Sequence, residues 1–316
     1  MNILRFKKIS ILKLISVPIF FFIYGFRSDY LNYYSYYINC YLNNFYNYAF
    51  EPGFSFLMAV ANELNIPFEI FWIVCNGFSI LTMFAFITPK ATSKSLSAYV
   101  FFAFLLTNIL SANLFSNLIR NTIGIGITLL LINKKAKWYL FLIPPFFHLA
   151  SIFLIFSHWI TNFFSRIKVN YVVLITILAY LLGPIIGIIG KDIIIDFLSS
   201  LDIRGIVNNL TTEYKPSYRY LSVILYLSLS YFLYVCYLSY KKNKFKNFGD
   251  TYTYGISIKN LYTLCVWTII SYPLYLATWG YGQFGRFLTF QIWVGEFMIL
   301  YFFIININNY FKNFQK

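Results

Sequence analysis

The sequence predicts an all-α fold, a polytopic integral membrane protein with about ten transmembrane helices, some of them short or broken. Of the 316 residues, 59% are hydrophobic and only 11% are charged, whereas soluble domains carry about 25% charged residues. Apolar runs of near-spanning length recur from end to end, and such runs satisfy their backbone in a bilayer as helices. Residues 1–316 are therefore expected to form a single transmembrane domain.

The net charge of +15 fits a membrane topology better than nucleic-acid binding. Lysines and arginines fall mostly in short clusters between apolar segments, as the positive-inside rule predicts for cytoplasmic loops. We therefore expect the lipid bilayer, and no nucleic acid, among the partners, with both termini in the cytoplasm. A composition rich in Ile, Asn, Lys, Phe and Tyr indicates an AT-rich coding region and favours a bacterial source.

The first half of the chain divides into predicted spans and one outer-face region. A basic N-terminal stretch precedes the first helix, 14–26, which is read as uncleaved. Residues 27–67 form an outer-face loop with an interfacial or re-entrant helix that opens at Glu51-Pro52-Gly53, because proline suits a first helical turn. Further spans are expected at 68–88, 96–115 and 117–132.

The stretch 138–160 is predicted to be broken at Pro144-Pro145, since neither proline can donate an intrahelical hydrogen bond. Basic residues on both flanks place both ends inside, so two short helices are expected to meet near His148 at the outer face. Broken helices at membrane depth are tolerated where they line protein or a water-filled cavity.

The second half adds four predicted spans, at 171–190, 220–240, 259–278 and 287–307. Between the first two lies the one sizeable polar loop of the chain, 191–219, which is placed on the outer face.

Five tyrosines of the outer-face loop share one predicted helical face, at i, i+3, i+4, i+7 and i+11. They are Tyr30, Tyr33, Tyr34, Tyr37 and Tyr41. Two interpretations stay open at this point. The face is either a platform on which sugar rings stack or an aromatic belt that anchors the protein at the interface.

Several arginines fall on the predicted outer face, where the positive-inside rule does not place them. In the stretch S-N-L-I-R-N-T-I-G-I-G, Arg120 opens an apolar helix and needs an anionic partner. With ten acidic residues to twenty-five basic ones, an exogenous anion is a candidate. The alternative is an arginine that snorkels to lipid headgroups. Arg286 follows a glycine-rich turn that either converges backbone N–H groups on an anion or is simply flexible. Phosphate is the anion that arginine binds bidentately.

Glu51 and His148 are the candidate proton acceptors on this face. Histidine has an unperturbed pKa suited to general base catalysis. Glu51 alternatively caps a helix N-terminus, and His148 alternatively packs as an ordinary histidine. The two histidines lie far apart and no metal-binding spacing occurs, so no metal is expected. Nucleotide-binding loops and the GxSxG motif are absent as well, so no cofactor is expected.

Four short motifs follow one another along the first half of the chain. They are F-R-S-D-Y-x-x-Y-Y from Phe26, E-P-G-F from Glu51, N-x-x-R-N-x-I-G-I from Asn117 and F-H-L-A-S from Phe147. Their order is similar to that seen in the EpsG-like family of Wzy-type bacterial polysaccharide polymerases. The first half of the chain therefore resembles this family, and the second half resembles it through topology and Arg286.

The resemblance implies glycosyl transfer by a membrane glycosyltransferase of polysaccharide biosynthesis, as in O-antigen (lipopolysaccharide) polymerases, with a helical fold of the GT-C kind. The growing glycan would leave polyprenyl (undecaprenyl) pyrophosphate and join a hydroxyl of the next lipid-linked repeat unit. Both lipid-linked oligosaccharides are expected partners, and a chain-length regulator is a further candidate. The expected location is the bacterial cytoplasmic (inner) membrane, with the active site facing the periplasm or outside.

Roles can be assigned to the outer-face residues on this basis. The candidate catalytic residues are Arg120 and Arg286, which would stabilise the departing pyrophosphate, and His148 and Glu51, either of which could act as base. The candidate substrate-binding residues are Arg27, Asp29, Tyr30, Tyr34, Asn117 and Arg219.

Two other classes of protein compete with the polymerase. An O-antigen ligase-like transferase would use the same donor with a lipid A acceptor and the same arginines. A non-enzymatic flippase or transporter of lipid-linked saccharide would show internal repeats and polar residues through the membrane depth. No repeat is found, and the charges gather near one face.

Overall fold

The computed structural model describes residues 11–25, 29–47, 50–87, 96–108, 118–149 and 151–164, with scattered shorter pieces between 108 and 118 and after 164. The side chains of 11–14, Asp29, 96–98 and 161–164 are not part of that description. The chain forms two compact units, Met1–Ile155 with Asp250–Asn260, and Phe156–Gly249 with Leu261–Lys316. All of the contacts that build the candidate site belong to the first unit.

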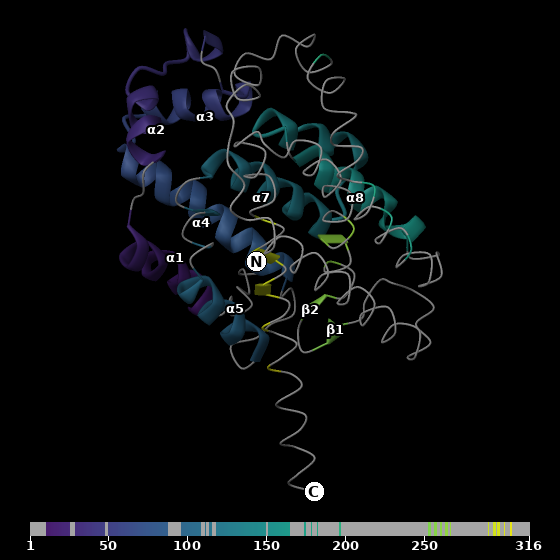
Figure 1. Cartoon of the computed structure of the whole chain (residues 1–316). Coiled ribbons are helices and arrows are strands. Elements are labelled where there is room, and N and C mark those ends of the chain that lie inside the picture. The colour runs from purple at the N-terminus through teal and green to yellow at the C-terminus, as the bar shows by residue number, and fades with distance from the viewer. Residues whose placement is uncertain are drawn as a thin grey trace, which may run out of the picture. The chain divides into compact units, whose positions relative to one another are not determined.

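Apolar helices form the framework of the first unit (Figure 1). α1 (Ile11–Tyr24), α4 (Phe68–Ile87), α5 (Leu96–Thr107) and α7 (Ile119–Asn133) correspond to the first four predicted spans. α4 packs against α7 over most of its length and also contacts α1. The predicted order of helices in this part of the chain is confirmed.

One described helix, α4, is long and apolar enough to cross a membrane, with 20 residues and a mean hydropathy of 2.1. Ile119–Asn133 is apolar but has only 15 residues, which gives a length of about 22 Å. A hydrocarbon core is about 30 Å thick. The predicted count of ten spans is therefore not confirmed by the described residues, whereas the helical, membrane-protein character is supported by α4.

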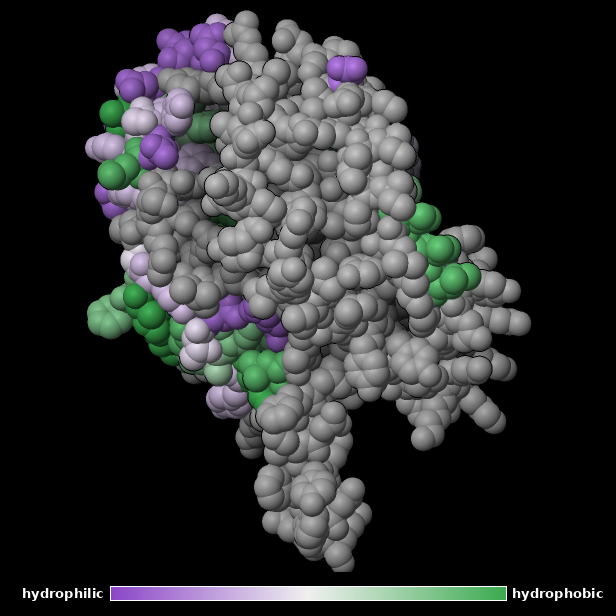
Figure 2. Space-filling model, viewed as in Figure 1, coloured by the Kyte–Doolittle hydropathy of each residue, from purple (hydrophilic) through white to green (hydrophobic). Residues whose placement is uncertain are grey.

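Apolar side chains are exposed on α1 and on α8 (Ser151–Phe164) (Figure 2). Phe22 of α1 is 91% exposed, and Phe156 and Trp159 of α8 are about half exposed. Hydrophilic side chains gather instead over the end of the first unit that carries α2 (Asp29–Tyr37) and α3 (Pro52–Glu63). Exposed large apolar side chains in such number are typical of a surface that contacts lipid.

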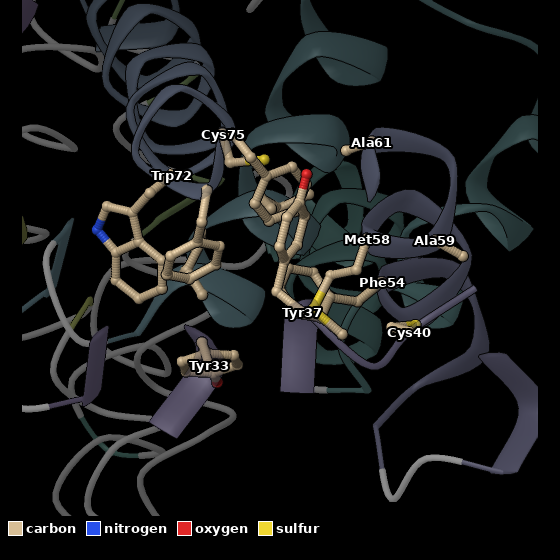
Figure 3. Packing of buried hydrophobic residues seen from close by; sticks show 13 residues of the cluster. Tyr33, Tyr37, Cys40, Phe54, Met58, Ala59, Ala61, Trp72 and Cys75 are labelled. Carbon is tan, nitrogen blue, oxygen red and sulfur yellow. The ribbon is translucent and has the colours of Figure 1, made fainter. Parts of the chain in front are cut away.

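The helix expected to open at Glu51 is present as α3, with Pro52 in its first turn. It is held by an aromatic cluster in which side chains from α2, α3 and α4 converge (Figure 3). Trp72 of α4 is completely buried, with its ring 5.5 Å from that of Tyr33 on α2. The hydroxyl of Tyr37 donates a 2.6 Å hydrogen bond to the carbonyl of Ile66. Tyr33 in turn contacts Phe54 near the start of α3, with ring centroids 5.7 Å apart, so the cluster holds the start of this helix.

The tyrosine face differs from the prediction. α2 ends at Tyr37, so Tyr41 lies beyond the helix. Tyr33 and Tyr37 are 9% and 3% exposed because they pack into the aromatic cluster. Tyr34 is 41% exposed. The face is thus mainly a packing surface against α4.

The stretch from Trp138 is not the predicted pair of short helices. It forms two 3-10 turns, η2 (Trp138–Leu142) and η3 (Pro144–Phe146), before α8 begins at Ser151. Pro144 and Pro145 cannot donate backbone hydrogen bonds. The chain here forms hydrogen bonds between residues three apart, such as that from Phe146 N to Ile143 O. A five-residue 3-10 turn spans only about 10 Å. The first predicted crossing of this stretch is therefore wrong, while its break before His148 is confirmed.

The prediction of an all-α fold holds for the described residues apart from one minimal hairpin. Its strands, β1 (Tyr252–Thr253) and β2 (Ile256–Ser257), pair antiparallel over two residues each. The four predicted spans of the second half and the loop 191–219 lie almost entirely outside the described residues.

Phe54 and Phe56 test whether the aromatic cluster holds α3. Phe54 is completely buried and Phe56 is 49% exposed on the same helix. We predict that Phe54→Ala lowers the free energy of unfolding by about 3 to 5 kcal/mol, because it empties a packed site. Phe56→Ala, the matched control, has a much smaller effect. Thermal unfolding of the detergent-solubilised protein measures both, and equal losses would contradict the role of the cluster.

Candidate functional site

Glu51 lies immediately before α3, and its side chain is not used as a helix cap. Its backbone adopts φ −59° and ψ 137°, and its carbonyl oxygen accepts hydrogen bonds from the N–H groups of Phe54 and Ser55. No cap hydrogen bond is formed by the carboxylate. The interpretation of Glu51 as a simple capping residue is therefore wrong.

The carboxylate of Glu51 joins two residues that the sequence places far away. Its Oε2 atom lies 2.6 Å from Nη1 of Arg120, and its Oε1 atom lies 2.7 Å from Nδ1 of His148. These partners are 69 and 97 residues further along the chain. Three of the four candidate catalytic residues thus meet in one cluster.

Arg120 is held by aromatic side chains as well as by Glu51. Its Nε atom donates a 2.9 Å hydrogen bond to the hydroxyl of Tyr33. Its guanidinium lies over the ring of Phe50, with 4.6 Å between the guanidinium carbon and the ring centroid, a cation–π contact. The snorkelling interpretation is therefore wrong, because the guanidinium is engaged inside the protein. Glu51 supplies an anionic partner for Arg120 within the protein.

The cluster is partly shielded from solvent. The side chains of Glu51, Arg120 and His148 are 21%, 26% and 16% exposed. Burial alone would raise the pKa of Glu51. The hydrogen bond from His148 and the positive charge of Arg120 outweigh burial and lower this pKa from 4.5 to about 2. Glu51 is consequently ionised at neutral pH and is a weak base.

The low pKa of Glu51 also fixes the tautomer of His148. An ionised carboxylate only accepts hydrogen bonds, so the proton of the 2.7 Å contact resides on Nδ1 of His148. In a neutral imidazole the lone pair is then on Nε2. The carboxylate holds Nδ1 and thereby orients the imidazole ring, which is the geometry of a base oriented by a carboxylate.

Tyr30 and Tyr34 lie on α2 beside this cluster but do not contact its charged groups. The hydroxyl of Tyr30 donates a 2.7 Å hydrogen bond to Oε1 of Glu69. Its ring stacks on that of Tyr34 and packs against that of Trp72, which also contacts the ring of Tyr33. Their predicted contact with substrate stays a prediction.

The other predicted site residues fall outside the described part of the structure. They are Arg27, Asn117, Arg219 and Arg286, together with the side chain of Asp29. Their proposed roles remain predictions from the sequence.

Tyr33 and Phe50 are site residues that the sequence reasoning did not assign to Arg120. Tyr33 was placed on the tyrosine face, but nothing in its spacing distinguished a partner of Arg120 from the other tyrosines. Phe50 lies just before Glu51. Its contact with Arg120 depends on the approach of the start of α3 to the start of α7, which the sequence does not show. Among the described residues, no group of three His, Cys, Asp or Glu side chains could hold a metal ion.

The fold and site define a helical membrane protein with a partly buried cation–carboxylate–imidazole cluster. Comparison with protein families then gives a specific assignment. The family described as the EpsG family matches residues 10–315, essentially the whole chain, so the protein belongs to the EpsG family. EpsG-like polymerases are of the Wzy type, and membership supports a membrane glycosyltransferase role in polysaccharide biosynthesis. Searches of curated proteins and of solved structures find no match.

The ion pairs of Glu51 predict how stability depends on pH. A carboxyl whose pKa is lowered from 4.5 to about 2 by folding adds stability that is fully present above the unfolded pKa and is lost as the pH falls through the folded pKa. We predict that Glu51→Gln lowers the free energy of unfolding by about 3 kcal/mol at neutral pH. The deficit of the variant relative to the wild type then shrinks as the pH is lowered from 5 toward 2.

Thermal unfolding in detergent across this pH range measures the effect. Glu63→Gln is the matched control, since Glu63 ends the same helix and is exposed. A deficit for Glu51→Gln that stays constant with pH would contradict the ion-pair origin of the stability.

Proposed function

We propose that the protein is a polysaccharide polymerase. It transfers a growing glycan from polyprenyl pyrophosphate to a hydroxyl of the next lipid-linked repeat unit at the outer face of the cytoplasmic membrane. The observation that carries this proposal is the bridging of Arg120 and His148 by Glu51 in a chain of the EpsG family. The cluster supplies a cation for a leaving group and an oriented base.

The proposed reaction is a direct displacement at the anomeric carbon of the donor. The acceptor hydroxyl gives its proton to Nε2 of His148, and the oxygen forms a bond to the anomeric carbon. The bond between that carbon and the pyrophosphate oxygen breaks, and its electron pair leaves with the lipid pyrophosphate. Glu51 accepts the hydrogen bond from Nδ1 throughout and stabilises the imidazolium that forms.

Arg120 has the geometry to act on the leaving pyrophosphate. Its Nε and Nη1 atoms bind Tyr33 and Glu51, while Nη2 donates to no side chain or carbonyl within the described residues. With 26% of its side chain exposed, the guanidinium retains an edge for a phosphate oxygen. Charge-assisted bonds of this kind stabilise negative charge that develops in a transition state.

A second cation is needed for this scheme. The charges of Arg120 and Glu51 cancel, so the pair alone offers a hydrogen bond to pyrophosphate but little net positive charge. Arg286 is the proposed second cation, with Arg27 as a third. Asp29, Tyr30, Tyr34, Asn117 and Arg219 are proposed to bind the saccharide and the headgroup.

The site variants test the reaction directly. We predict that Arg120→Ala lowers the rate of glycan extension about 100-fold or more, because transition-state charge is no longer stabilised. His148→Gln lowers the rate by about 10² to 10⁴, because it removes the base. Arg120→Lys does not restore the wild-type rate, since an ammonium cannot bind Tyr33, Glu51 and phosphate with one planar group.

The measurement is a ladder gel of products formed by membranes supplied with the lipid-linked repeat unit, at matched protein level. Lys134→Ala is the control, because it removes an exposed charge at the opposite end of α7. Normal ladders in the Arg120 and His148 variants would overturn the proposed site. Capping of lipid A by the wild type without extension would indicate the ligase, and passage of unextended lipid-linked saccharide would indicate a transporter.

A further inference from the structure

Two glycines lie where the loop that carries His148 approaches the helices that carry its partners. Gly53 is two residues after Glu51, in the first turn of α3. A methyl group placed on Gly53 would lie 2.8 Å from the backbone oxygen of Phe146 and 3.0 Å from its carbonyl carbon. Because these are backbone atoms, no side-chain rotation can relieve such a contact.

Gly124 provides the second close approach. It lies four residues after Arg120 on α7, and residues at this spacing share one face of a helix. A methyl group on Gly124 would lie 3.1 Å from Cβ of His148 and 3.3 Å from its backbone nitrogen. Carbon atoms are usually separated by about 3.5 to 4.0 Å. The backbone of His148 therefore rests directly on α7 at this position.

The other crowded helical glycines of the described chain do not touch this loop. A methyl group on Gly126 would meet Thr82, Phe78 and Ser79 of α4, with a closest approach of 2.8 Å. On Gly77 its nearest neighbour would be the side chain of Val17, at 3.0 Å. These positions are as tight as Gly53 and Gly124, but they serve helix packing away from His148.

We propose that Gly53 and Gly124 are positioning residues that set the distance between His148 and Glu51. Gly53 follows Glu51 by two residues, and Gly124 follows Arg120 by about one turn of α7. Gly53 allows the close approach of Phe146, and Gly124 allows that of His148. The loop is thus seated against α3 on one side and α7 on the other. The consequence for catalysis rests on the proposed role of His148 as base, but the positioning itself does not.

A displacement of this loop by a few tenths of an ångström would change the 2.7 Å distance between Nδ1 of His148 and Oε1 of Glu51. The hydrogen bond from Nδ1 to Glu51 would lengthen and bend, and hydrogen bonds weaken steeply with poor alignment. The lone pair on Nε2 would turn with the ring. Arg120 is not among the nearest atoms that a methyl group on either glycine would meet, so its surface for phosphate is expected to change less than the position of His148.

The first readout is the hydrogen bond itself, measured by nuclear magnetic resonance on histidine-labelled protein in detergent. The chain has two histidines, so a His158→Gln background leaves His148 as the only signal. We expect a downfield Nδ1 proton that is absent in Glu51→Gln. If the His158→Gln variant does not fold, the signal is assigned in the chain with both histidines, as the downfield proton that Glu51→Gln removes.

The expected result is a shift or loss of this proton signal in Gly53→Ala and in Gly124→Ala. Gly77→Ala and Gly126→Ala, the matched controls, retain it. Thermal unfolding identifies any variant that does not fold, and the other glycine then carries the test. An unchanged signal in the folded Gly53→Ala and Gly124→Ala proteins would overturn the inference, as would an equal change in the controls.

The second readout is glycan extension. We expect Gly53→Ala and Gly124→Ala to lower kcat about tenfold, with KM changed less than about twofold, since misplacement of a catalytic group slows chemistry more than binding. The controls keep kcat near the wild-type value. If the proton signal responds as expected while even the wild type extends no glycan, the proposed function fails and the positioning role stands.

Discussion

The carboxylate of Glu51 is the interaction on which the described site depends. It accepts hydrogen bonds from a guanidinium and an imidazole that lie 69 and 97 residues away in the chain. Removing a charge from water is costly, and a partly buried ion pair persists only when its geometry offsets that cost. Here both carboxylate oxygens are used, at 2.6 and 2.7 Å. A single side chain thereby ties the start of α3, the start of α7 and the loop before α8 to one point.

The surrounding aromatic residues make this arrangement possible. Phe50 and Tyr33 cover the guanidinium of Arg120 with one ring face and one hydroxyl, which lowers the local dielectric without leaving the cation unpaired. Trp72, fully buried on α4, packs against the ring of Tyr33. The same cluster that stabilises α3 therefore also shapes the environment in which Glu51 keeps a pKa of about 2. Fold stability and site electrostatics share the same residues here.

The sequence predicts the individual parts of this site better than their assembly. Apolar length and basic flanks locate α4 and α7, and Pro52 and Pro144-Pro145 mark the start of α3 and the break before His148. Glu51, Arg120 and His148 could be selected because charge and imidazole are rare in such a composition. Their direct contact could not be predicted, because periodicity describes one helix at a time and the pairing joins three segments. The same limit explains why the sequence leaves the face of Tyr33 and Tyr37 open between packing and ligand binding. The stretch from Trp138 differs from the prediction for a local reason, because Pro144 and Pro145 cannot donate backbone hydrogen bonds.

The charge balance of the cluster indicates where charges develop during the proposed reaction. Before reaction, the charges of Arg120 and Glu51 offset each other. As the acceptor proton moves to His148, the cluster gains one positive charge while the departing lipid pyrophosphate gains one negative charge. Both charges develop within a partly shielded site, where their attraction is stronger than in water. The carboxylate that fixes the imidazole tautomer also stabilises the imidazolium. In the proposed reaction, Glu51 therefore acts by orienting and stabilising His148 rather than as the base. The proposal thus links proton transfer to departure of the leaving group through the same carboxylate that pairs with Arg120.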